Sequence, residues 1–371
     1  MPDKNLHIII SGGGTGGHIF PAIAIADALK QQAPGSRILF VGANGKMEME
    51  KVPAAGYKIE GIPVRGLQRK LTLSNLAFPV RLLVSLMKAR SIIRRFRPDV
   101  AVGVGGYASG PLLRMAIAAG IPSVIQEQNS YPGLTNKLLA KNTKKICVAY
   151  PGMEKYFPED KIELTGNPVR KDILNLNGKK LEAAKHFGLN PDARTLLITG
   201  GSLGARTINE SVNKNIGLFI SEGLQVIWQC GKNYYPFASS LIPEVEGKGV
   251  RIMEFISRMD YAYALADLVV SRAGAIALAE LSIAGKPAIL IPSPNVAEDH
   301  QTHNAMAMVK NEAAVLIKDM QAEGELGNTV LELMNDNIRM NTLSENIKKM
   351  AFHDSAEKIA SIVLETANQK K

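Results

Sequence analysis

The densest group of chemically useful residues lies at positions 11–18, where SGGGTGGH places five glycines and a histidine together. The β-branched run at residues 6–10 predicts a buried parallel strand before it, and the apolar spacing of residues 19–29 predicts a helix after it. Glycine admits positive φ angles and lets a ligand approach the amide groups, while a helix N-terminus supplies N–H donors and a partial positive charge. The stretch therefore predicts an anion site, most often one for phosphate.

The same stretch satisfies G-x-G-x-x-G through Gly12, Gly14 and Gly17, which raises the alternative of a nicotinamide or flavin dinucleotide site. Such a site needs an acidic residue about 20 positions further on, at the end of the second strand. Residues 37–46, RILFVGANGK, contain neither Asp nor Glu, which argues against a dehydrogenase. A tight turn with a purely structural role remains open.

Length and composition indicate a soluble globular protein of two domains. A chain of 371 residues is long for a single core, and 46% hydrophobic with 21% charged residues is an ordinary globular balance. The start, MPDKNLH, lacks the pattern of a signal peptide, and no run of 18 apolar residues occurs, so we expect a chain that is neither secreted nor membrane-spanning. The two cysteines, Cys147 and Cys230, are expected to be free thiols.

The net charge of +10 predicts an acidic partner, which could be nucleic acid, an anionic bilayer or a phosphorylated substrate. Residues 61–98 contain no Asp or Glu and interleave basic with apolar side chains, a combination that favours a bilayer surface. Only two aromatic residues, Phe78 and Phe96, lie there, which argues against nucleic acid. An amphipathic helix with a solvated basic face is the alternative. The basic residues are Arg65, Arg69, Lys70, Arg81, Lys88, Arg90, Arg94, Arg95 and Arg97.

Strand, glycine loop and helix recur twice more along the chain, in RPDVAVGVGGYASGPLLRMAIAAG from residue 97 and in TLLITGGSLGARTINESV from residue 195. This alternation predicts an α/β fold with doubly wound parallel sheets, and the new start at residue 195 marks a second Rossmann-like half. The Asn- and Pro-containing stretch near residues 167 and 168 predicts the linker. Because ligands bind at the carboxyl ends of parallel strands, we expect the loops of both sheets to face one another across a cleft that holds the ligand phosphates.

Seven ordered motifs give the chain a specific resemblance: SGGGTGGHIFPA, GVGGYASGP, QEQNSYPGLTNK, TGNPVR, TGGSLGAR, EFISRMDYAYALADLVVSRAGAIALAELSIAGKPAILIP and EDHQTHNA. The chain resembles the MurG family. The resemblance implies the GT-B glycosyltransferase fold and an inverting transfer of N-acetylglucosamine (GlcNAc) from UDP-GlcNAc. The implied acceptor is the 4-hydroxyl of undecaprenyl-pyrophosphoryl-N-acetylmuramyl pentapeptide, the step from lipid I to lipid II in peptidoglycan synthesis.

The resemblance also implies the domain limits and the donor site. An acceptor- and membrane-binding domain is expected at residues 1–167 with a returning C-terminal helix at about 353–371, and a UDP-GlcNAc-binding domain at 168–352. Within the donor site, Glu280 is expected at the ribose, Arg170 and Ser202 at the diphosphate, and Phe255 and Ile256 at the uracil. The expected donor-binding residues are Thr15, Gly16, Gly17, Asn129, Arg170, Ser202, Phe255, Ile256, Arg272, Ala275, Glu280, Gln301 and Asn304.

The acceptor pyrophosphate is expected at the first two glycine loops, at Gly13, Gly14, Gly105, Gly106, Tyr107 and Ser109. By the resemblance, His18 lies at the active centre, where a neutral imidazole can take the proton of the attacking hydroxyl. Its alternative role is to cap or hydrogen-bond the loop. Glu127, Gln128 and Asn129 resemble the family's acceptor-side polar cluster, and Glu127 and Asn129 are expected to be catalytic. Many relatives have His where this chain has Gln126, which puts any role of that imidazole in doubt here.

Neither a metal nor a cofactor is expected. No Asp-x-Asp occurs, so the charge of the leaving diphosphate must be met by helix N-termini and arginine. His300 and His303, beside Glu298 and Asp299, form an H-x-x-H pair that lacks a recognisable third ligand.

The implied location is the cytoplasmic face of the bacterial inner membrane, with the protein attached peripherally through residues 61–98. Cell-wall synthesis proteins are possible partners, and nucleic acid is not expected. Two rivals remain: another UDP-sugar enzyme of the same fold, such as a UDP-GlcNAc 2-epimerase, and a non-catalytic protein that binds UDP-sugars or lipid.

Overall fold

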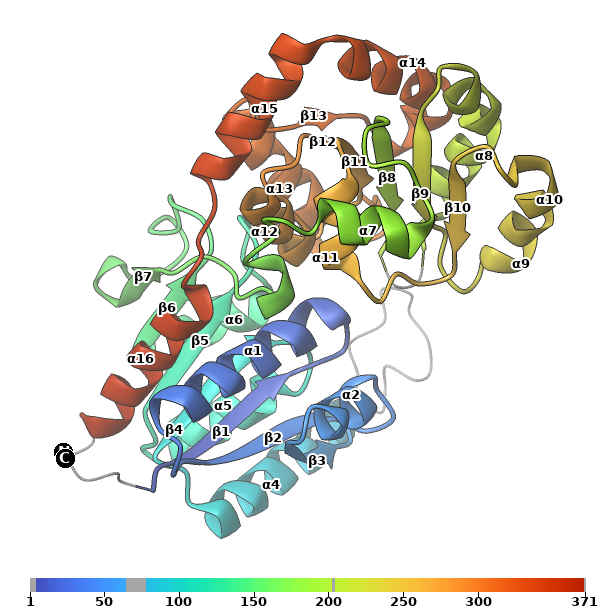
Figure 1. The fold of residues 1–371 in the computed structure, drawn as a ribbon. Helices are drawn as coiled ribbons and strands as arrows, with labels where there is room; N and C mark the ends of the chain where they lie inside the picture. Colours follow the sequence, from blue (N-terminus) through green and yellow to red (C-terminus); the bar gives the residue numbers. More distant parts are fainter. Residues whose placement is uncertain (1–4, 65–77, 202–203, 370–371) are drawn as a thin grey trace. The chain divides into compact units, whose positions relative to one another are not determined.

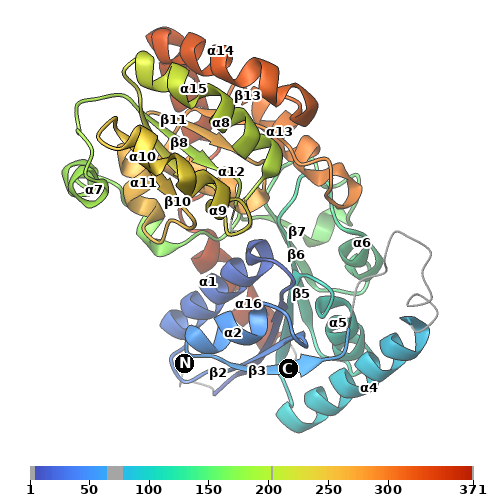
Figure 2. The same ribbon diagram turned by 90° about the vertical axis from the view of Figure 1, so that its right-hand side faces the viewer.

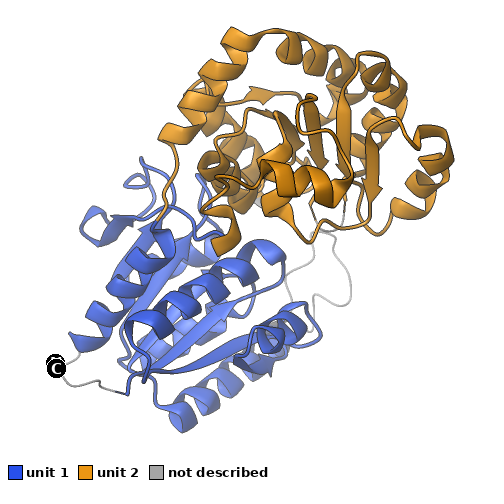
Figure 3. Ribbon diagram, viewed as in Figure 1, with its two compact units in different colours: residues 1–169, 354–371 blue, residues 170–353 orange. Residues whose placement is uncertain are grey.

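A computed structural model of the chain describes residues 5–64, 78–201 and 204–369, and it divides them into two compact units (Figure 3). Unit 1 comprises residues 1–169 and 354–371, and unit 2 comprises residues 170–353. Ser202 and residues 65–77, with Arg65, Arg69 and Lys70, lie outside the described residues. The chain passes between the units next to the predicted linker.

Unit 1 is built on one parallel sheet with the strand order β3-β2-β1-β4-β5-β6-β7 (Figure 1). Its strands are β1 (His7–Gly12), β2 (Arg37–Ala43), β3 (Lys58–Ile62), β4 (Val100–Gly105), β5 (Ser123–Glu127), β6 (Lys145–Val148) and β7 (Ile162–Leu164). Its helices are α1 (Gly16–Gln32), α2 (Glu48–Ala54), α4 (Phe78–Phe96), α5 (Ser109–Ala118), α6 (Leu134–Ala140) and α16 (Ser355–Asn368). The order reverses between β1 and β4, which is where a doubly wound sheet binds ligands.

Helices cover both faces of this sheet: α4, α5 and α6 lie on one side, and α1, α2 and α16 on the other (Figure 2). The central strand is apolar on both faces, since Ile8 and Ile10 pack towards α1 while Ile9 packs towards α5. The last helix, α16, buries Ile359 and Val363 in the same core as α1. Residues from the far end of the chain thus complete the first unit.

Unit 2 repeats the plan with the strand order β10-β9-β8-β11-β12-β13. Its strands are β8 (Thr195–Thr199), β9 (Gln225–Gln229), β10 (Val250–Met253), β11 (Leu268–Ser271), β12 (Ala288–Leu290) and β13 (Val315–Leu316). Its helices are α7 (Lys180–Phe187), α8 (Arg206–Ser221), α9 (Tyr235–Ala238), α10 (Ile242–Val245), α11 (Met259–Leu265), α12 (Ala275–Ala284), α13 (His300–Val309), α14 (Ala322–Asn335) and α15 (Asn337–Lys349). The predicted pair of Rossmann-like parallel sheets is confirmed.

Candidate active site

The first two glycine loops touch each other at the switch point of unit 1. The Gly13 N–H donates to the Gly105 carbonyl at 3.3 Å. A Cβ added to Gly106 would lie only 2.2 Å from the Gly13 carbonyl oxygen, and the φ of Gly106 is +86°. Only glycine fits this contact, because a side chain would be strained and would clash with backbone. The glycines that were predicted as phosphate cradles therefore also pack the two loops together.

His18 lies in the first turn of α1, against the second glycine loop. Its Nδ1 is 3.3 Å from the Thr15 hydroxyl. A Cβ on Gly105 would lie 2.5 Å from the His18 Cδ2, so the imidazole ring rests on the bare Cα of that glycine. Thr15 is exposed and His18 is partly exposed. The Thr15 contact and the packing on Gly105 both orient the imidazole, which suits a general base but leaves its catalytic role a prediction.

Glu48, a residue that the sequence analysis did not single out, holds the first glycine loop through a hydrogen bond to its backbone. Its side chain is fully buried. Its Oε2 accepts the Gly14 N–H at 2.9 Å and its Oε1 accepts the Ala43 N–H at 2.9 Å. Glu48 comes five residues after Ala43, and its carboxylate lies beside the end of β2. Both of its oxygens accept from backbone N–H groups of unit 1, so the carboxylate is not placed to bind a ribose. The signal in the sequence was an acidic residue in the first turn of a helix next to the loop.

Glu127 organises the polar cluster at the end of β5. Its Oε1 accepts from the backbone N–H and the Nδ2 of Asn129 at 3.0 and 3.2 Å. Its Oε2 accepts from the Gly133 N–H at 3.1 Å and from the Asn136 Nδ2 at 2.8 Å. Burial raises the pKa of the Glu127 carboxyl, and these hydrogen bonds oppose that rise. Since protein donors fill its acceptor sites, the observed contacts suit a residue that positions Asn129.

The remaining predicted residues of unit 1 differ in exposure. Tyr107 is 54% exposed and available to a ligand. Ser109 is fully buried, and its Oγ packs towards Gly103 without a hydrogen bond to any residue that the structure describes. Its backbone N–H donates to the carbonyl of Gly106, another predicted acceptor residue, at 3.3 Å, so Ser109 lies at the second glycine loop with its hydroxyl buried and its acceptor role stays a prediction. Gln126, also buried, donates from Nε2 to the Asn167 Oδ1 at 2.8 Å and so fastens the linker to β5.

In unit 2, Arg170 and Glu280 lie together. Arg170 Nε is 3.0 Å from Glu280 Oε1, Arg170 Nη2 is 3.2 Å from Oε2, and the Tyr263 hydroxyl donates to Oε2 at 3.3 Å. Burial raises the pKa of the Glu280 carboxyl, and the Arg170 charge opposes this rise. Two residues predicted to bind different parts of one nucleotide therefore hold each other here.

The segments predicted for the diphosphate and the uracil follow the ends of β8 and β10. Gly201 has a φ of +84°, and its N–H donates to the Thr199 hydroxyl at 3.2 Å. Phe255 is 54% exposed, whereas Ile256 is buried and its N–H donates to the Gln229 Oε1 at 2.8 Å. Ala275 begins α12 directly after Gly274.

Three further predicted donor residues make contacts within unit 2. Arg272 Nη1 donates to the carbonyls of Ile291 and Pro292 at 3.0 and 3.1 Å and pairs with Asp319. Gln301 accepts the Ser293 N–H at 2.9 Å. Asn304 lies three residues later on α13 but is fully buried, and its Nδ2 donates to the Ala273 carbonyl at 3.3 Å. Arg272 and Asn304 thus hold the ends of β11 and β12 in place.

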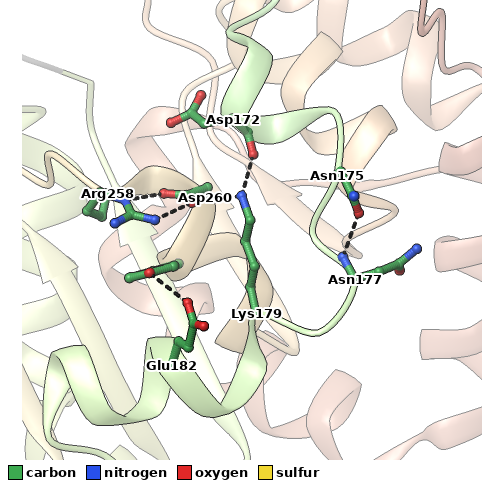
Figure 4. A network of polar contacts seen from close by, with 8 residues as sticks. Asp172, Asn175, Asn177, Lys179, Glu182, Arg258 and Asp260 are labelled. Carbon is green, nitrogen blue, oxygen red and sulfur yellow. Dashed lines mark hydrogen bonds and ion pairs between the residues drawn. The ribbon is translucent and has the colours of Figure 1, made fainter.

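An ion-pair network around the buried Asp260 connects the segment after Arg170 with α11 (Figure 4). Asp260 Oδ2 accepts from Lys179 Nζ at 2.9 Å and from Arg258 Nη2 at 2.7 Å. Lys179 also donates to the Asp172 carbonyl at 2.9 Å. Arg258, followed by Lys179, holds the pKa of the Asp260 carboxyl well below its usual range. The network anchors both the start of unit 2 and the helix that follows Phe255 and Ile256.

No group of three or more His, Cys, Asp or Glu in residues 5–64, 78–201 and 204–369 is placed to hold a metal ion. Across those same ranges, every helix is too short or too polar to span a bilayer.

Comparison with known proteins identifies the family. Residues 8–148 match the glycosyltransferase family 28 N-terminal domain, and residues 195–359 match the glycosyltransferase family 28 C-terminal domain. A protein of Parabacteroides distasonis is 55% identical over 367 residues, which are 99% of this chain and 100% of that protein. The chain belongs to glycosyltransferase family 28. The relative from Parabacteroides distasonis is named UDP-N-acetylglucosamine--N-acetylmuramyl-(pentapeptide) pyrophosphoryl-undecaprenol N-acetylglucosamine transferase. A protein of Cytophaga hutchinsonii with the same name is 54% identical, and the match covers 99% of this chain and 99% of that protein.

Solved structures agree with the family 28 assignment. The crystal structure of Acinetobacter baumannii MurG has a TM-score of 0.75 and 28% identity, covering 97% of this chain and 99% of that one. A UDP-N-acetylglucosamine 2-epimerase has a TM-score of 0.65 at 14% identity, covering 99% and 98%, a likeness of fold alone. The predicted GT-B glycosyltransferase fold and the predicted MurG resemblance are confirmed.

Proposed function

We propose that this family 28 glycosyltransferase transfers GlcNAc from UDP-GlcNAc to the muramyl 4-hydroxyl of undecaprenyl-pyrophosphoryl-N-acetylmuramyl pentapeptide. The observation that carries the proposal is the match, over essentially the full length of both chains, to relatives named for this transfer. Both sheets also carry glycine loops at their switch points, where a doubly wound fold binds phosphates. The reaction is a single displacement: the 4-hydroxyl forms a bond to C1 of GlcNAc, its proton goes to a base, and UDP leaves with the bonding electrons.

For the donor, Glu280 accepts the ribose hydroxyls and Arg170 contacts the diphosphate. Glu280 is supported by its burial, which excludes water from a carboxylate that can accept both hydroxyls of a diol. Arg170 is supported by its position beside that carboxylate and by the planar fork that matches phosphate oxygens.

For the acceptor, the contacting glycine loops of unit 1 hold the pyrophosphate and His18 is the base. The orientation of His18 by Thr15 and Gly105 supports this role, because a base must be held in place to take a proton from the attacking hydroxyl. Base catalysis of this kind contributes about 10²- to 10⁴-fold in rate.

The exposed face of α4 binds an anionic membrane surface. Val80, Leu83, Val84 and Met87 recur at helical spacing and are 64%, 57%, 41% and 55% exposed. Exposed Lys88, Arg90 and Arg94 follow on the same helix. The sequence showed nine basic residues and no acidic residue in this segment, but Arg95 does have an acidic partner. It pairs with Glu60, which lies just before the segment, at 2.5 Å. Apolar and basic side chains together favour an anionic bilayer, and they support peripheral attachment at the inner membrane.

Dependence of the reaction on the acceptor distinguishes the proposed transferase from the alternative, a UDP-GlcNAc 2-epimerase. Purified protein is incubated with UDP-GlcNAc, with and without lipid-linked muramyl pentapeptide, and nucleotides and sugars are quantified. The proposal predicts UDP release that requires the acceptor. Conversion of the UDP-sugar to its 2-epimer without acceptor would reject it, and binding of UDP-GlcNAc with no turnover under either condition would favour a non-catalytic protein.

A further inference from the structure

The side chain of Gln229 spans the two segments that the proposed function assigns to the uridine nucleotide. It is the last residue of β9, at the carboxyl edge of the sheet in unit 2, and is 4% exposed. Its Nε2 donates to the Gly201 carbonyl at 3.0 Å and to the Thr199 hydroxyl at 3.3 Å. Its Oε1 accepts the Ile256 N–H at 2.8 Å. One amide thus uses both its donors on the glycine-loop side and its acceptor on the uracil side.

The contacts on the glycine-loop side form a closed set. The Thr199 hydroxyl accepts both from Gln229 and from the Gly201 N–H, so the backbone N–H and carbonyl of Gly201 are both held. Gly201 has a φ of +84°, a conformation that glycine adopts without steric cost. The register pairs Gln229 with Thr199 on β8 and with Met253 on β10, so a side chain at this position lies between the ends of both neighbouring strands.

We propose that Gln229 is a positioning residue that sets the distance and orientation between the phosphate-binding and uracil-binding segments of the donor site. This inference rests on the proposed function of that site. It assigns Gln229 no contact with the nucleotide. A nucleoside diphosphate must contact both segments at once, so two segments that one amide already holds in place bind it without first being ordered.

The chain contains a matched control four residues earlier on the same strand. Gln225 is 7% exposed and also bridges with one amide: its Oε1 accepts the Asn190 N–H at 2.7 Å, and its Nε2 donates to the Asn190 carbonyl at 2.8 Å and the Thr195 hydroxyl at 3.2 Å. Gln225 lies at the opposite end of β9, near the amino edge of the sheet. Substitutions at Gln225 and Gln229 therefore remove similar buried hydrogen bonds, but only one set lies beside the donor segments.

The experiment compares the wild type with Gln229→Ala, Gln229→Asn, Gln225→Ala and Gln225→Asn in the full-length protein. Binding of uridine and of UDP is measured by calorimetry, thermal unfolding by circular dichroism, and KM for donor and acceptor by UDP release. Asn keeps the amide but is one methylene shorter and cannot span both segments. If Gln229→Ala fails to fold, the UDP affinity of Gln229→Asn tests the proposal instead.

The proposal predicts that Gln229→Ala raises the Kd for UDP and the donor KM by about 10-fold or more, since buried hydrogen bonds of this kind are lost. It also predicts that the gain in affinity from uridine to UDP shrinks, while acceptor KM stays within about twofold and Gln225→Ala binds UDP like the wild type. Equal UDP affinity in Gln229→Ala and the wild type would overturn the inference and leave the donor site standing. Equal losses of UDP affinity in the Gln225 and Gln229 variants would overturn the inference, because they would show only that the protein is less stable. If the wild type itself fails to bind UDP, the proposed donor site falls first.

Discussion

Arg170 and Glu280 form a bidentate ion pair, with Nε 3.0 Å from Oε1 and Nη2 3.2 Å from Oε2. The Tyr263 hydroxyl adds a third donor to Glu280. A carboxylate offers about four acceptor positions, so a ribose diol that donates two hydrogen bonds must displace at least one of these three. The donor in best position to leave is Arg170, because the diphosphate of the same nucleotide offers its guanidinium a new partner.

The exchange predicts opposite effects on two ligands. Arg170→Met should lower UDP affinity by about 10-fold or more, because a charge-assisted contact with phosphate is lost. The same variant should bind uridine as well as the wild type or better, because nothing then competes for Glu280. Calorimetric titration with both ligands checks this prediction. A parallel loss of uridine affinity would contradict it and would show that Arg170 is needed to hold Glu280 in place.

Donor binding should weaken as pH falls. The ionised Glu280 carboxylate accepts the ribose hydroxyls, and burial raises the pKa of this carboxyl while the Arg170 charge opposes the rise. Uridine affinity should therefore increase as pH rises through the Glu280 pKa, and Arg170→Met should move the midpoint to higher pH. Titrations in a pH series test this, with 2′-deoxyuridine as the control ligand. An unchanged midpoint in the variant would contradict the assignment.

Replacing His18 separates chemistry from donor binding. His18→Ala should reduce turnover by about 10²- to 10⁴-fold and leave UDP affinity nearly unchanged. Thr15→Val, which removes the hydroxyl 3.3 Å from Nδ1, should cause a smaller loss because the ring still packs on Gly105. Stopped-time measurement of UDP release gives both rates. Wild-type turnover in His18→Ala would reject His18 as the base.

Glu48 should control acceptor binding without contacting the acceptor. Glu48→Gln replaces one acceptor by an amide N–H facing the Gly14 or Ala43 N–H, which should destabilise unit 1 by about 1–3 kcal/mol. We expect the acceptor KM to rise by about 10-fold while UDP affinity stays unchanged. Exposed Glu50, on the same helix, provides the control Glu50→Gln, which should resemble the wild type. A loss of stability with an unchanged acceptor KM would show that the loop tolerates the change.

Membrane binding should depend on the exposed face of α4. Leu83→Ser combined with Met87→Ser, or Lys88→Glu combined with Arg94→Glu, should release the protein from vesicles that contain anionic lipid, because burial of apolar surface and attraction to the lipid both contribute. The matched control is Leu181→Ser with Ile338→Ser, which changes two aliphatic side chains of unit 2 that are 71% and 82% exposed. Vesicle sedimentation measures the bound fraction. Retention of both α4 variants at wild-type level would exclude this face.

Much of the fold could be predicted because strands and helices leave local signals. The strand and the helix predicted on either side of the glycine loop in TLLITGGSLGARTINESV are β8, which begins at Thr195, and α8, which begins at Arg206. An apolar run before the glycine loop marks the strand, and apolar residues that recur at helical spacing after the loop mark the helix. Signals of this kind lie within a few residues of the element that they define.

The side-chain contacts of the site could not be predicted in this way, since their partners are distant in sequence. Gln229 and Gly201 are 28 residues apart, and Glu48 and Gly14 are 34 apart. Motifs also do not reveal which side of a helix is buried, so Ser109 and Asn304 were expected at ligands although both side chains are buried. The charge count of residues 61–98 missed Glu60, which meets Arg95 from a neighbouring strand.

The most direct test of the account follows the sugar itself. Purified protein is mixed with labelled UDP-GlcNAc and the lipid-linked muramyl pentapeptide in vesicles, with EDTA present, and the lipid product is analysed by mass spectrometry. The account predicts an acceptor heavier by one GlcNAc residue, joined at the muramyl 4-hydroxyl, with one UDP released per transfer. Label that stays on the nucleotide, or that reaches another acceptor while the muramyl lipid is unchanged, would contradict it.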